Sequence, residues 1–441
     1  MNVATFSLRR RFFYGWALVG VAAFIMVIGT VPLFQGLPVW VVVLGREFGW
    51  SNTQFSIAFS LSRVEGSILG PISGYLIDKL GSRRMVIIGL IVSGGGFVLM
   101  SQMQNIWHFY GAFIIMSAGV GLGTWMPMMT VLNNWFLRNR STAMALAMEG
   151  FLVGGMILVP LLAFLVDPDV PGRPGWRVTT LAIGLFLIVV AFPLSRLIRN
   201  APEPYGQFPD GAAAPSPPTG ATAVQADEEE PDYTWQEALR TRNFWLMTMG
   251  HACSSIVIVT ITVHLGKMLD SREFSLQTVG LVSGAYTGIA AVFTLIGGYV
   301  GDRLPIRLAL FVFSAVQSAA VFVLMLAESL WMAYLFAVLM GIGFGGRNPL
   351  TTAIRGVYFG RKAFASITGI SMIPMNVMLL AAPLFVGIWV DATGSYIIPM
   401  GVVAVVSLAG SGLFLFLGSP QAANEARRRR ASTAVQATQA D

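Results

Sequence analysis

The 441-residue chain is 55% hydrophobic and 11% charged, with a mean hydropathy of +0.70 and a formal net charge of +7. Soluble domains carry about 25% charged residues, so this composition excludes a soluble globular protein. A single cysteine, Cys253, excludes a fold that depends on disulfides.

The apolar residues form a dozen stretches of about 20 residues or more, each long enough to cross a hydrocarbon core about 30 Å thick. They lack strict apolar/polar alternation, which predicts helices rather than a β-barrel. The first stretch is too long for a signal-peptide core, so no cleavable signal is expected. We therefore predict an all-α membrane protein with spans, in chain order, at residues 15–44, 51–77, 85–103, 107–135, 142–166, 176–197, 243–268, 275–300, 307–327, 331–357, 363–390 and 394–418.

The cations are distributed unequally between the two sets of loops. With the N-terminus inside, 21 of the 28 Lys and Arg residues lie on the inner side, five lie outside, and Arg63 and Arg347 fall within spans. The positive-inside rule then predicts that both termini are cytoplasmic in a multi-pass protein of the cell (inner) membrane. The basic pI of about 9.8 reflects this topology, and no nucleic-acid partner is expected.

Two segments recur at nearly constant spacing. GYLIDKLGSRR (Gly74–Arg84) returns as GYVGDRLPIR (Gly298–Arg307), and AGVGLGTWMP (Ala118–Pro127) returns as MGIGFGGRNP (Met340–Pro349). Such repeats predict two pseudo-symmetric six-helix bundles around a central cavity. The expected domains are residues 1–199 and 243–420, joined by a Pro/Ala/Gly-rich cytoplasmic linker at 200–242 and followed by a basic cytoplasmic tail at 421–441.

The first repeated segment is similar to the loop signature of the major facilitator superfamily. FYGW at Phe13–Trp16, the segment Asn134–Gly150 and the segment Ala382–Tyr396 resemble the monocarboxylate-porter and oxalate/formate-antiporter branch. The resemblance implies a non-enzymatic secondary transporter, active as a monomer in the bilayer. It implies alternating access for a small organic anion, a mono- or dicarboxylate, with proton coupling or exchange for a counter-substrate. Spans one, eight and eleven lack the charged residues of those relatives, so their substrate-binding positions do not transfer.

The same resemblance assigns a gating role to the loop signature. In such proteins Asp78 faces the N-terminal end of span eleven, where a carboxylate is favourable. Gly74 is expected to permit close helix contact, and Arg83 and Arg84 to pair with acidic groups or headgroups. Asp302 and Arg303 occupy the matching place in the second half. The alternative is that the cations only set topology.

Two arginines within spans are the candidates for binding an anion. An arginine in hydrocarbon costs about 2.5–3.5 kcal/mol on insertion scales, which argues against lipid exposure. Arg63 belongs to a small, polar stripe of span two formed by Ser56, Ser60, Ser67, Gly70 and Gly74. Arg347 lies in span ten, with Asn348 and Thr351 nearby and Trp125 as its repeat counterpart. The alternative is a structural charge paired with Glu149 or Glu65.

Three residues are candidates for proton coupling: Glu149 in apolar sequence, Glu65, and His251, which titrates in a useful range. Glu65 lies about 200° around the helix from Arg63, so it is not a same-face partner. The alternatives are a buried ion pair for Glu149 and a hydrogen-bonded structural role for His251. No metal-ligand spacing, nucleotide-binding loop or catalytic arrangement is found, so no cofactor is expected.

Two other functions remain open. An efflux carrier for amphiphilic compounds usually has glycine-x-x-x-glycine-proline in span five, whereas here Gly154 is followed by Gly155 and the proline is displaced to Pro160. A non-transporting receptor or scaffold on the same fold is disfavoured because the chain has no large soluble domain.

The predicted topology can be tested with fused reporters. A reporter inserted between Ala212 and Glu229, or fused after Arg430, should score as cytoplasmic, because both sites follow an even number of spans. A periplasmic score at either site would contradict twelve spans with the N-terminus inside.

Overall fold

The computed structural model describes residues 13–136, 139–211, 233–301, 303–359 and 364–418. Within these ranges the chain forms α-helices with short 3₁₀ and π segments and no strand. The predicted all-α class is therefore confirmed.

The N-terminal half contains six spans. Its helices are α1 (Tyr14–Thr30), the π segment η1 (Val31–Gln35), α2 (Leu37–Phe48), α3 (Asn52–Leu80), α4 (Ser82–Ser101), α5 (Ile106–Gly123), α6 (Trp125–Trp135), α7 (Arg140–Val166) and α8 (Gly175–Leu197). Two short 3₁₀ turns follow, η2 (Glu203–Tyr205) and η3 (Pro209–Gly211).

The C-terminal half repeats this plan. Its helices are α9 (Trp235–Leu239), α10 (Arg242–Asp270), α11 (Leu276–Gly301), α12 (Ile306–Met325), α13 (Leu330–Phe359), α14 (Phe364–Thr393) and α15 (Ile397–Gly412), with a final 3₁₀ turn η4 (Leu413–Phe416). α9 is one short turn with a capping box between Thr234 and Glu237. Residues 212–232 of the central linker and the whole basic tail lie outside the described residues.

In the described part of the chain, eleven helical segments are long and apolar enough to cross a membrane. The remaining long helix is α3, whose 29 residues include Arg63 and Glu65. A helix this polar is stable in a bilayer only where protein or water covers its polar side. α3 packs against α5 and α14, and with this protein-covered helix the spans number the predicted twelve.

Spans one and four are irregular where they meet. The π segment η1 interrupts span one, and Thr124, with φ −112° and ψ −87°, separates α5 from α6 in span four. The hydroxyls of Thr30 and Thr124 lie 3.5 Å apart. In span ten, the repeat counterpart of span four, α13 is continuous. Interruptions of this kind often occur at functional sites.

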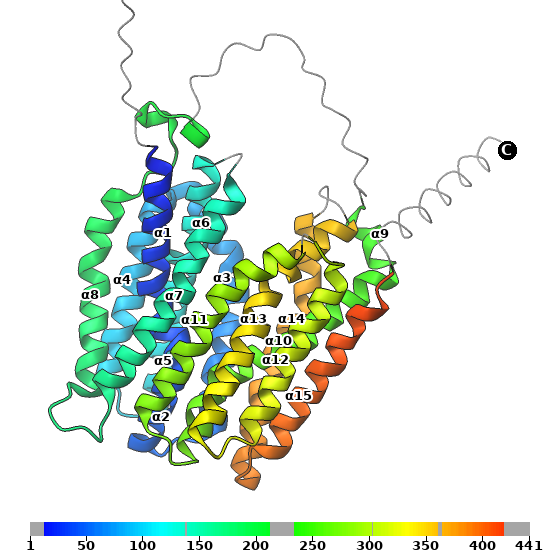
Figure 1. The fold of residues 1–441 in the computed structure, drawn as a ribbon. Coiled ribbons are helices and arrows are strands. Elements are labelled where there is room, and N and C mark those ends of the chain that lie inside the picture. The colour runs from blue at the N-terminus through cyan, green and yellow to red at the C-terminus, as the bar shows by residue number, and fades with distance from the viewer. Residues whose placement is uncertain (1–12, 137–138, 212–232, 302, 360–363, 419–441) are drawn as a thin grey trace, which may run out of the picture.

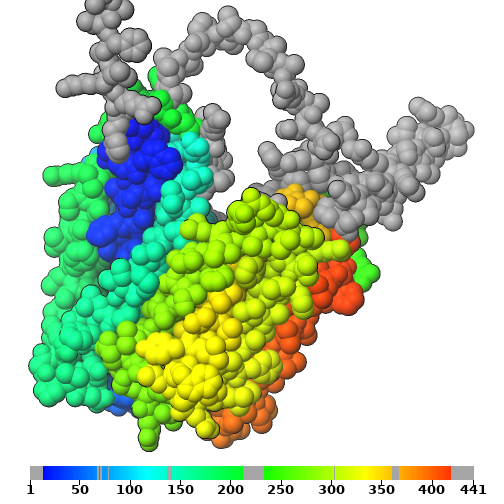
Figure 2. Space-filling view, in the orientation of Figure 1, coloured from blue at the N-terminus to red at the C-terminus, as the bar shows by residue number. Residues whose placement is uncertain are grey.

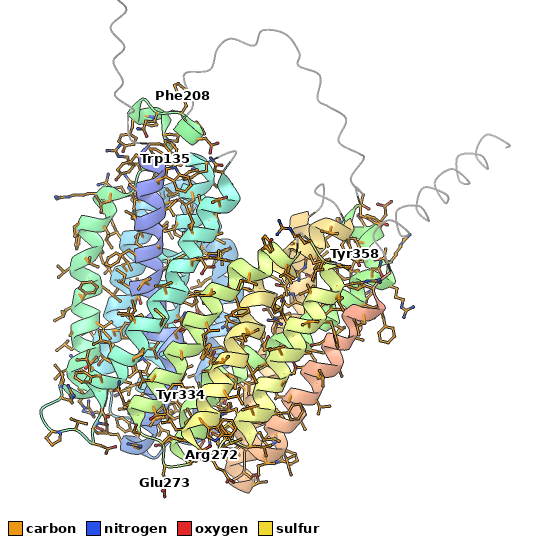
Figure 3. All side chains as sticks on the ribbon, in the orientation of Figure 1. Trp135, Phe208, Arg272, Glu273, Tyr334 and Tyr358 are labelled. Atoms are coloured by element: carbon orange, nitrogen blue, oxygen red, sulfur yellow. The ribbon has the colours of Figure 1, made fainter. Side chains whose placement is uncertain are left out.

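The two halves stand side by side with their helices roughly parallel (Figure 1). We call the end of the molecule that carries Trp135 and Tyr358 the open end, and the end that carries Arg272 and Glu273 the closed end (Figure 3). Across the interface, α2 packs on α10, α3 on α14 and α7 on α11. Figure 2 shows the contact between α7, in teal, and α11, in yellow-green.

Two glycines allow the halves to approach closely near the closed end. A Cβ added to Gly266 of α10 would collide with the backbone carbonyl of Pro38 in α2. A Cβ added to Gly387 of α14 would lie 2.9 Å from the Ser56 hydroxyl and 3.1 Å from the Asn52 carbonyl oxygen of α3. Both positions therefore require a residue without a side chain while this end is closed.

Gly387→Val should consequently separate α3 from α14 at the closed end. In a Cys253→Ala background, a cysteine placed at Ser60, which is 6% exposed, should react several-fold faster with a bulky maleimide. Gly401→Val in α15 is the matched control, because its only close neighbour is the Met325 sulfur at 3.6 Å. Equal rates in the two variants would contradict the tight packing at Gly387.

Candidate functional site

A cavity of about 640 Å³ lies between the two halves. Most of its wall comes from α1, η1, α3, α5, α6 and α7, and α14 supplies the part from the C-terminal half. The lining residues are Met26, Thr30, Phe34, Ser62, Arg63, Glu65, Gly66, Leu69, Ser73, Ser117, Val120, Gly121, Thr124, Trp125, Met126, Met148, Phe151, Met372 and Asn376. The interruptions at η1 and Thr124 both border it.

Arg63 is exposed to this cavity from about the middle of α3. Its guanidinium carbon lies 4.6 Å from the centre of the Phe59 ring and 5.8 Å from that of Phe34. The aromatic faces stabilise a cation in a setting that contains little water. Arg63 thus avoids lipid, as the cost of burying its charge predicts.

Glu65 and Trp125 line the same cavity. Helical spacing assigns Glu65 to a different face from Arg63, but the cavity extends around more than one face of α3 and reaches both. Ser117 is hydrogen-bonded to the Glu65 carboxyl, whose Oε2 is buried without a hydrogen bond. Trp125 is 53% exposed because it begins α6 directly after the interruption at Thr124.

Arg347 lies elsewhere, in a buried cluster of the C-terminal half. It is 4% exposed, and its Nη1 donates to Ser254 Oγ at 2.5 Å and to Ser255 Oγ at 3.4 Å. Its Nε is buried without a hydrogen bond. Arg347 does not line the cavity described above.

Arg355, two turns further along α13, belongs to the same cluster and is 2% exposed. It donates from Nε to Ser371 Oγ at 3.0 Å, from Nη1 to the Thr351 carbonyl at 2.7 Å and from Nη2 to His251 Nδ1 at 2.8 Å. In the described ranges the ion pairs join Arg46 to Asp169 and Asp270, and Arg177 to Glu47. Arg347 and Arg355 take part in none of them.

The other predicted site residues lie near the cavity or near the buried cluster of Arg347 and Arg355. Thr351 is 6% exposed and donates its hydroxyl to the Asn348 carbonyl at 2.8 Å, and Asn348 is half-buried. Glu149 is half-buried on α7 between the cavity-lining Met148 and Phe151, but does not line the cavity itself. Among the described residues, His, Cys, Asp and Glu form no group of three or more that could hold a metal ion.

Charged side chains join the halves at the closed end. Arg46 of α2 donates to Asp270 of α10 at 2.5 and 3.0 Å and to Asp169 at 2.9 Å. Its hydrogen bond to Asp270 raises the pKa of Arg46 above its ordinary value. The Lys267 ammonium donates to the Trp50 carbonyl, again across the interface.

Asp391 makes the most extensive of these contacts. Its carboxylate accepts from the backbone N–H of Asn52 at 2.9 Å, the backbone N–H of Thr53 at 2.8 Å and the Asn52 side-chain amide at 3.0 Å. These are the first amides of α3, so a carboxylate at the end of α14 occupies the positive end of α3. Tyr396 adds a hydrogen bond from its hydroxyl to Asn52 Oδ1 at 2.7 Å.

From this contact toward the open end, Ser56 and Ser60 of the polar stripe lie along α14. Ser56 Oγ donates to the Pro383 carbonyl at 3.0 Å, and Ser60 Oγ donates to the Leu380 carbonyl at 3.2 Å. His264 Nε2 lies 2.9 Å from the same Pro383 oxygen. α14 continues through Pro383, and side chains from α3 and α10 both contact the carbonyl of this residue.

The loop signature lies at the opposite, open end. A Cβ at Gly74 would meet nothing within 4 Å, so the expected close helix contact is not made in this conformation. Arg83 and Arg84 are exposed, and the Arg303 guanidinium lies 3.6 Å from the centre of the Tyr299 ring. Only the backbone of Asp78 is described, and Asp302 lies outside the described residues.

Two functional candidates, Asp391 and Arg355, were not identified as site residues from the sequence. Asp391 lies two residues before the end of α14, as Asp78 lies two residues before the end of α3. That matching position is the signal that could have indicated Asp391. Arg355 continues the polar row Gly343–Arg347–Thr351, but nothing in the sequence indicates its contact with His251.

Comparison with known proteins agrees with this architecture. A sequence profile of the Major Facilitator Superfamily matches residues 18–275 and 247–439. Monocarboxylate transporter 11 of Mus musculus is 25% identical over 420 residues, covering 92% of this chain and 88% of the relative. The oxalate:formate antiporter of Oxalobacter formigenes is 24% identical over 262 residues, covering 58% and 56%.

A solved structure gives the same fold. It is a bacterial homologue of the human lysosomal transporter Spinster in an inward-facing, unoccupied conformation, with a TM-score of 0.66 at 15% identity over 93% of this chain and 96% of that one. The profile match covers most of the chain, and the twelve-span, two-bundle architecture agrees with it. The chain belongs to the major facilitator superfamily of membrane transporters, with relatives among the monocarboxylate porters and the oxalate–formate antiporter.

Proposed function

We propose that this protein carries a small organic anion, a mono- or dicarboxylate, across the cell membrane by alternating access. The observation that carries the proposal is the cavity between the halves, into which Arg63 presents a guanidinium between two aromatic rings. A carboxylate can accept two parallel hydrogen bonds from such a group. The similarity to monocarboxylate transporter 11 supports the same substrate class.

The proposed orientation places the open end and both termini in the cytoplasm. The support is the distribution of Lys and Arg, because the loops at the open end carry most of the cations. In this orientation the conformation described here is closed toward the outside by Arg46, Lys267 and Asp391. The substrate would enter or leave the cavity from the cytoplasmic side.

The cycle would alternate between two equivalent contacts of α3 with α14. The two helices are antiparallel, since successive contacts pair Asn52 with Asp391, Ser56 with Pro383 and Ser60 with Leu380. Asp391 therefore occupies the N-terminus of α3 at one end. Asp78, at the matching place in α3, would occupy the N-terminus of α14 when the other end closes. Each aspartate would stabilise one of the two states.

Proton coupling would use carboxyl groups close to the cavity. Glu65 lines it, with one oxygen free of hydrogen bonds, and Glu149 lies on α7 between two lining residues. A proton bound with the anion would reduce the charge that must cross the membrane. Exchange for a counter-substrate would serve the same purpose without a proton.

An efflux carrier for amphiphilic compounds is the second candidate, and the composition of the cavity wall favours it. Met26, Met126, Met148 and Met372 line the cavity together with two phenylalanines. Flexible, polarisable methionine side chains are typical of surfaces that accept varied apolar partners.

Uptake into proteoliposomes separates the two candidates. We expect radiolabelled acetate, lactate, oxalate or succinate to accumulate, with stimulation by an inward proton gradient or by preloaded carboxylate. Accumulation of an amphiphilic dye without uptake of any carboxylate would favour the efflux function.

Arg63→Ala should weaken binding of the transported carboxylate by roughly thirtyfold or more, because truncating one partner of a desolvated charge pair costs about 2–5 kcal/mol. Arg63→Lys keeps the charge but loses the planar guanidinium that can donate two parallel hydrogen bonds. Its affinity for the carboxylate should therefore lie between those of wild type and Arg63→Ala. Calorimetry on monodisperse protein measures both. The same measurement on Arg347→Ala tests the other candidate arginine. Unchanged affinity for the carboxylate in Arg63→Ala would show that Arg63 is not part of the binding site.

Asp391→Asn and Asp78→Asn should shift the conformational equilibrium in opposite directions. Losing the charge at Asp391 weakens the closed end and should favour the state open to the outside, whereas Asp78→Asn should favour the state described here. Distances between spin labels at the two ends report both populations. A shift in the same direction for both variants would rule out the proposed pair of contacts.

A further inference from the structure

A histidine and two arginines meet in the C-terminal half, and none of the described residues provides them with an acidic partner. His251 comes from α10, and Arg347 and Arg355 come from α13. Arg355 donates directly to the His251 ring, and Arg347 donates to Ser254, whose hydroxyl in turn donates to the His251 carbonyl at 3.1 Å. His251 is half-buried, whereas both arginines are almost fully buried.

The contact between Arg355 and His251 determines the state of the imidazole. A guanidinium has hydrogen-bond donors and no acceptor, so Nδ1 must accept the bond of 2.8 Å from Arg355 Nη2. His251 is therefore neutral here, and its ring proton is on Nε2. A second proton cannot bind to Nδ1 unless Arg355 first moves away.

The remaining bonds of Arg355 do not compensate its charge. They go to the Ser371 hydroxyl and the Thr351 carbonyl, both neutral. Arg347 is bonded only to serine hydroxyls, and its Nε has no partner. Two buried cations with neutral partners are costly, and an arriving anion would relieve that cost.

We propose that Arg355 couples proton binding to anion binding by exchanging the His251 ring for a substrate carboxylate. This inference rests on the proposed function. When a carboxylate moves from the cavity into the cluster and accepts the hydrogen bond from Arg355, Nδ1 of His251 becomes free and accepts a proton from water that enters with it. The carboxylate and the proton then add one negative and one positive charge to the cluster, so its net charge does not change. On release, Arg355 returns to Nδ1 and expels the proton.

The coupling is reciprocal by thermodynamic necessity. If the anion increases proton binding at His251 by a given factor, the proton increases anion binding by the same factor. Among the described residues, the charged groups that act on His251 are Arg347 and Arg355. α14 and α15, which pack closely on α10, carry one charged side chain between them, Asp391 at the closed end. Within the described ranges, no carboxylate lies close enough to His251 to replace the substrate as the partner of Arg355.

The inference can be tested without knowing the substrate. The chain contains three histidines, so ¹⁵N-histidine spectra of purified protein in lipid nanodiscs can be assigned with His251→Gln. In wild type, His251 should show the neutral form protonated at Nε2 across the neutral pH range. In Arg355→Gln, protonation of Nδ1 should occur at a pH at which the wild-type ring remains neutral.

Ser371→Ala provides a matched control. It removes another hydrogen bond of the same guanidinium and leaves the contact with His251, so the wild-type spectrum should persist. If Arg355→Gln misfolds, Arg355→Lys retains the charge and tests the loss of the fork geometry by the same spectra. Identical His251 titration in wild type and in the folded Arg355 variant would overturn the proposal.

A second arm separates this inference from the proposed function. Addition of each carboxylate of the uptake panel to wild-type protein should produce the Nδ1-protonated form for those that are transported. In vesicles, His251→Gln removes the proton site and keeps Arg355, so it should lose stimulation by a proton gradient but retain exchange. If no carboxylate is transported, the proposed function fails, although the spectra still report on Arg355 and His251. If carboxylates are transported and leave His251 unprotonated, the coupling proposal alone fails.

Discussion

The cost of placing a charged group in hydrocarbon governs where this protein puts its polar side chains. On insertion scales an arginine at mid-membrane costs about 2.5–3.5 kcal/mol, so it must face water, protein or a ligand. Arg63 faces a cavity between the halves, with two aromatic rings beside it. Arg347 and Arg355 are buried within the C-terminal half, where they donate to hydroxyl, carbonyl and imidazole groups. The charges that pair directly with carboxylates, such as Arg46, lie at the end of the molecule, where water is close.

The same constraint explains the pairing of α3 with α14. α3 is too polar to face lipid along its length, and its stripe of small hydroxyl residues meets the backbone carbonyls of α14. Ser56, Ser60 and Gly387 let the two helices approach, and Asp391 then reaches the first amides of α3. Packing and electrostatics at the closed end thus depend on one another.

Much of this architecture was predictable because hydrophobic length, cation distribution and internal repeats are properties of the chain itself. The all-α class follows from them, and the polar stripe of α3 indicated that Arg63 avoids lipid. The cavity was harder to predict, since Pro32 in η1 is a local signal for an irregular span, whereas the residues that line the cavity come from helices far apart in the chain. Helical spacing separated Glu65 from Arg63, but the cavity reaches both. The contact between Arg355 and His251 joins residues 104 positions apart, so no local pattern could indicate it.

The buried arginines also bear on how the transporter responds to voltage. Moving one elementary charge through a full membrane potential changes the free energy by about 2.3 kcal/mol per 100 mV, and a charge at intermediate depth experiences part of that. Arg63 in the cavity and the buried Arg347 and Arg355 make the carrier electropositive at intermediate depth. A carboxylate that binds together with one proton leaves that net charge unchanged, so in the proposed orientation a negative interior would draw the empty and the loaded carrier toward the cytoplasm equally. The potential would then change how often each state is occupied without driving net transport.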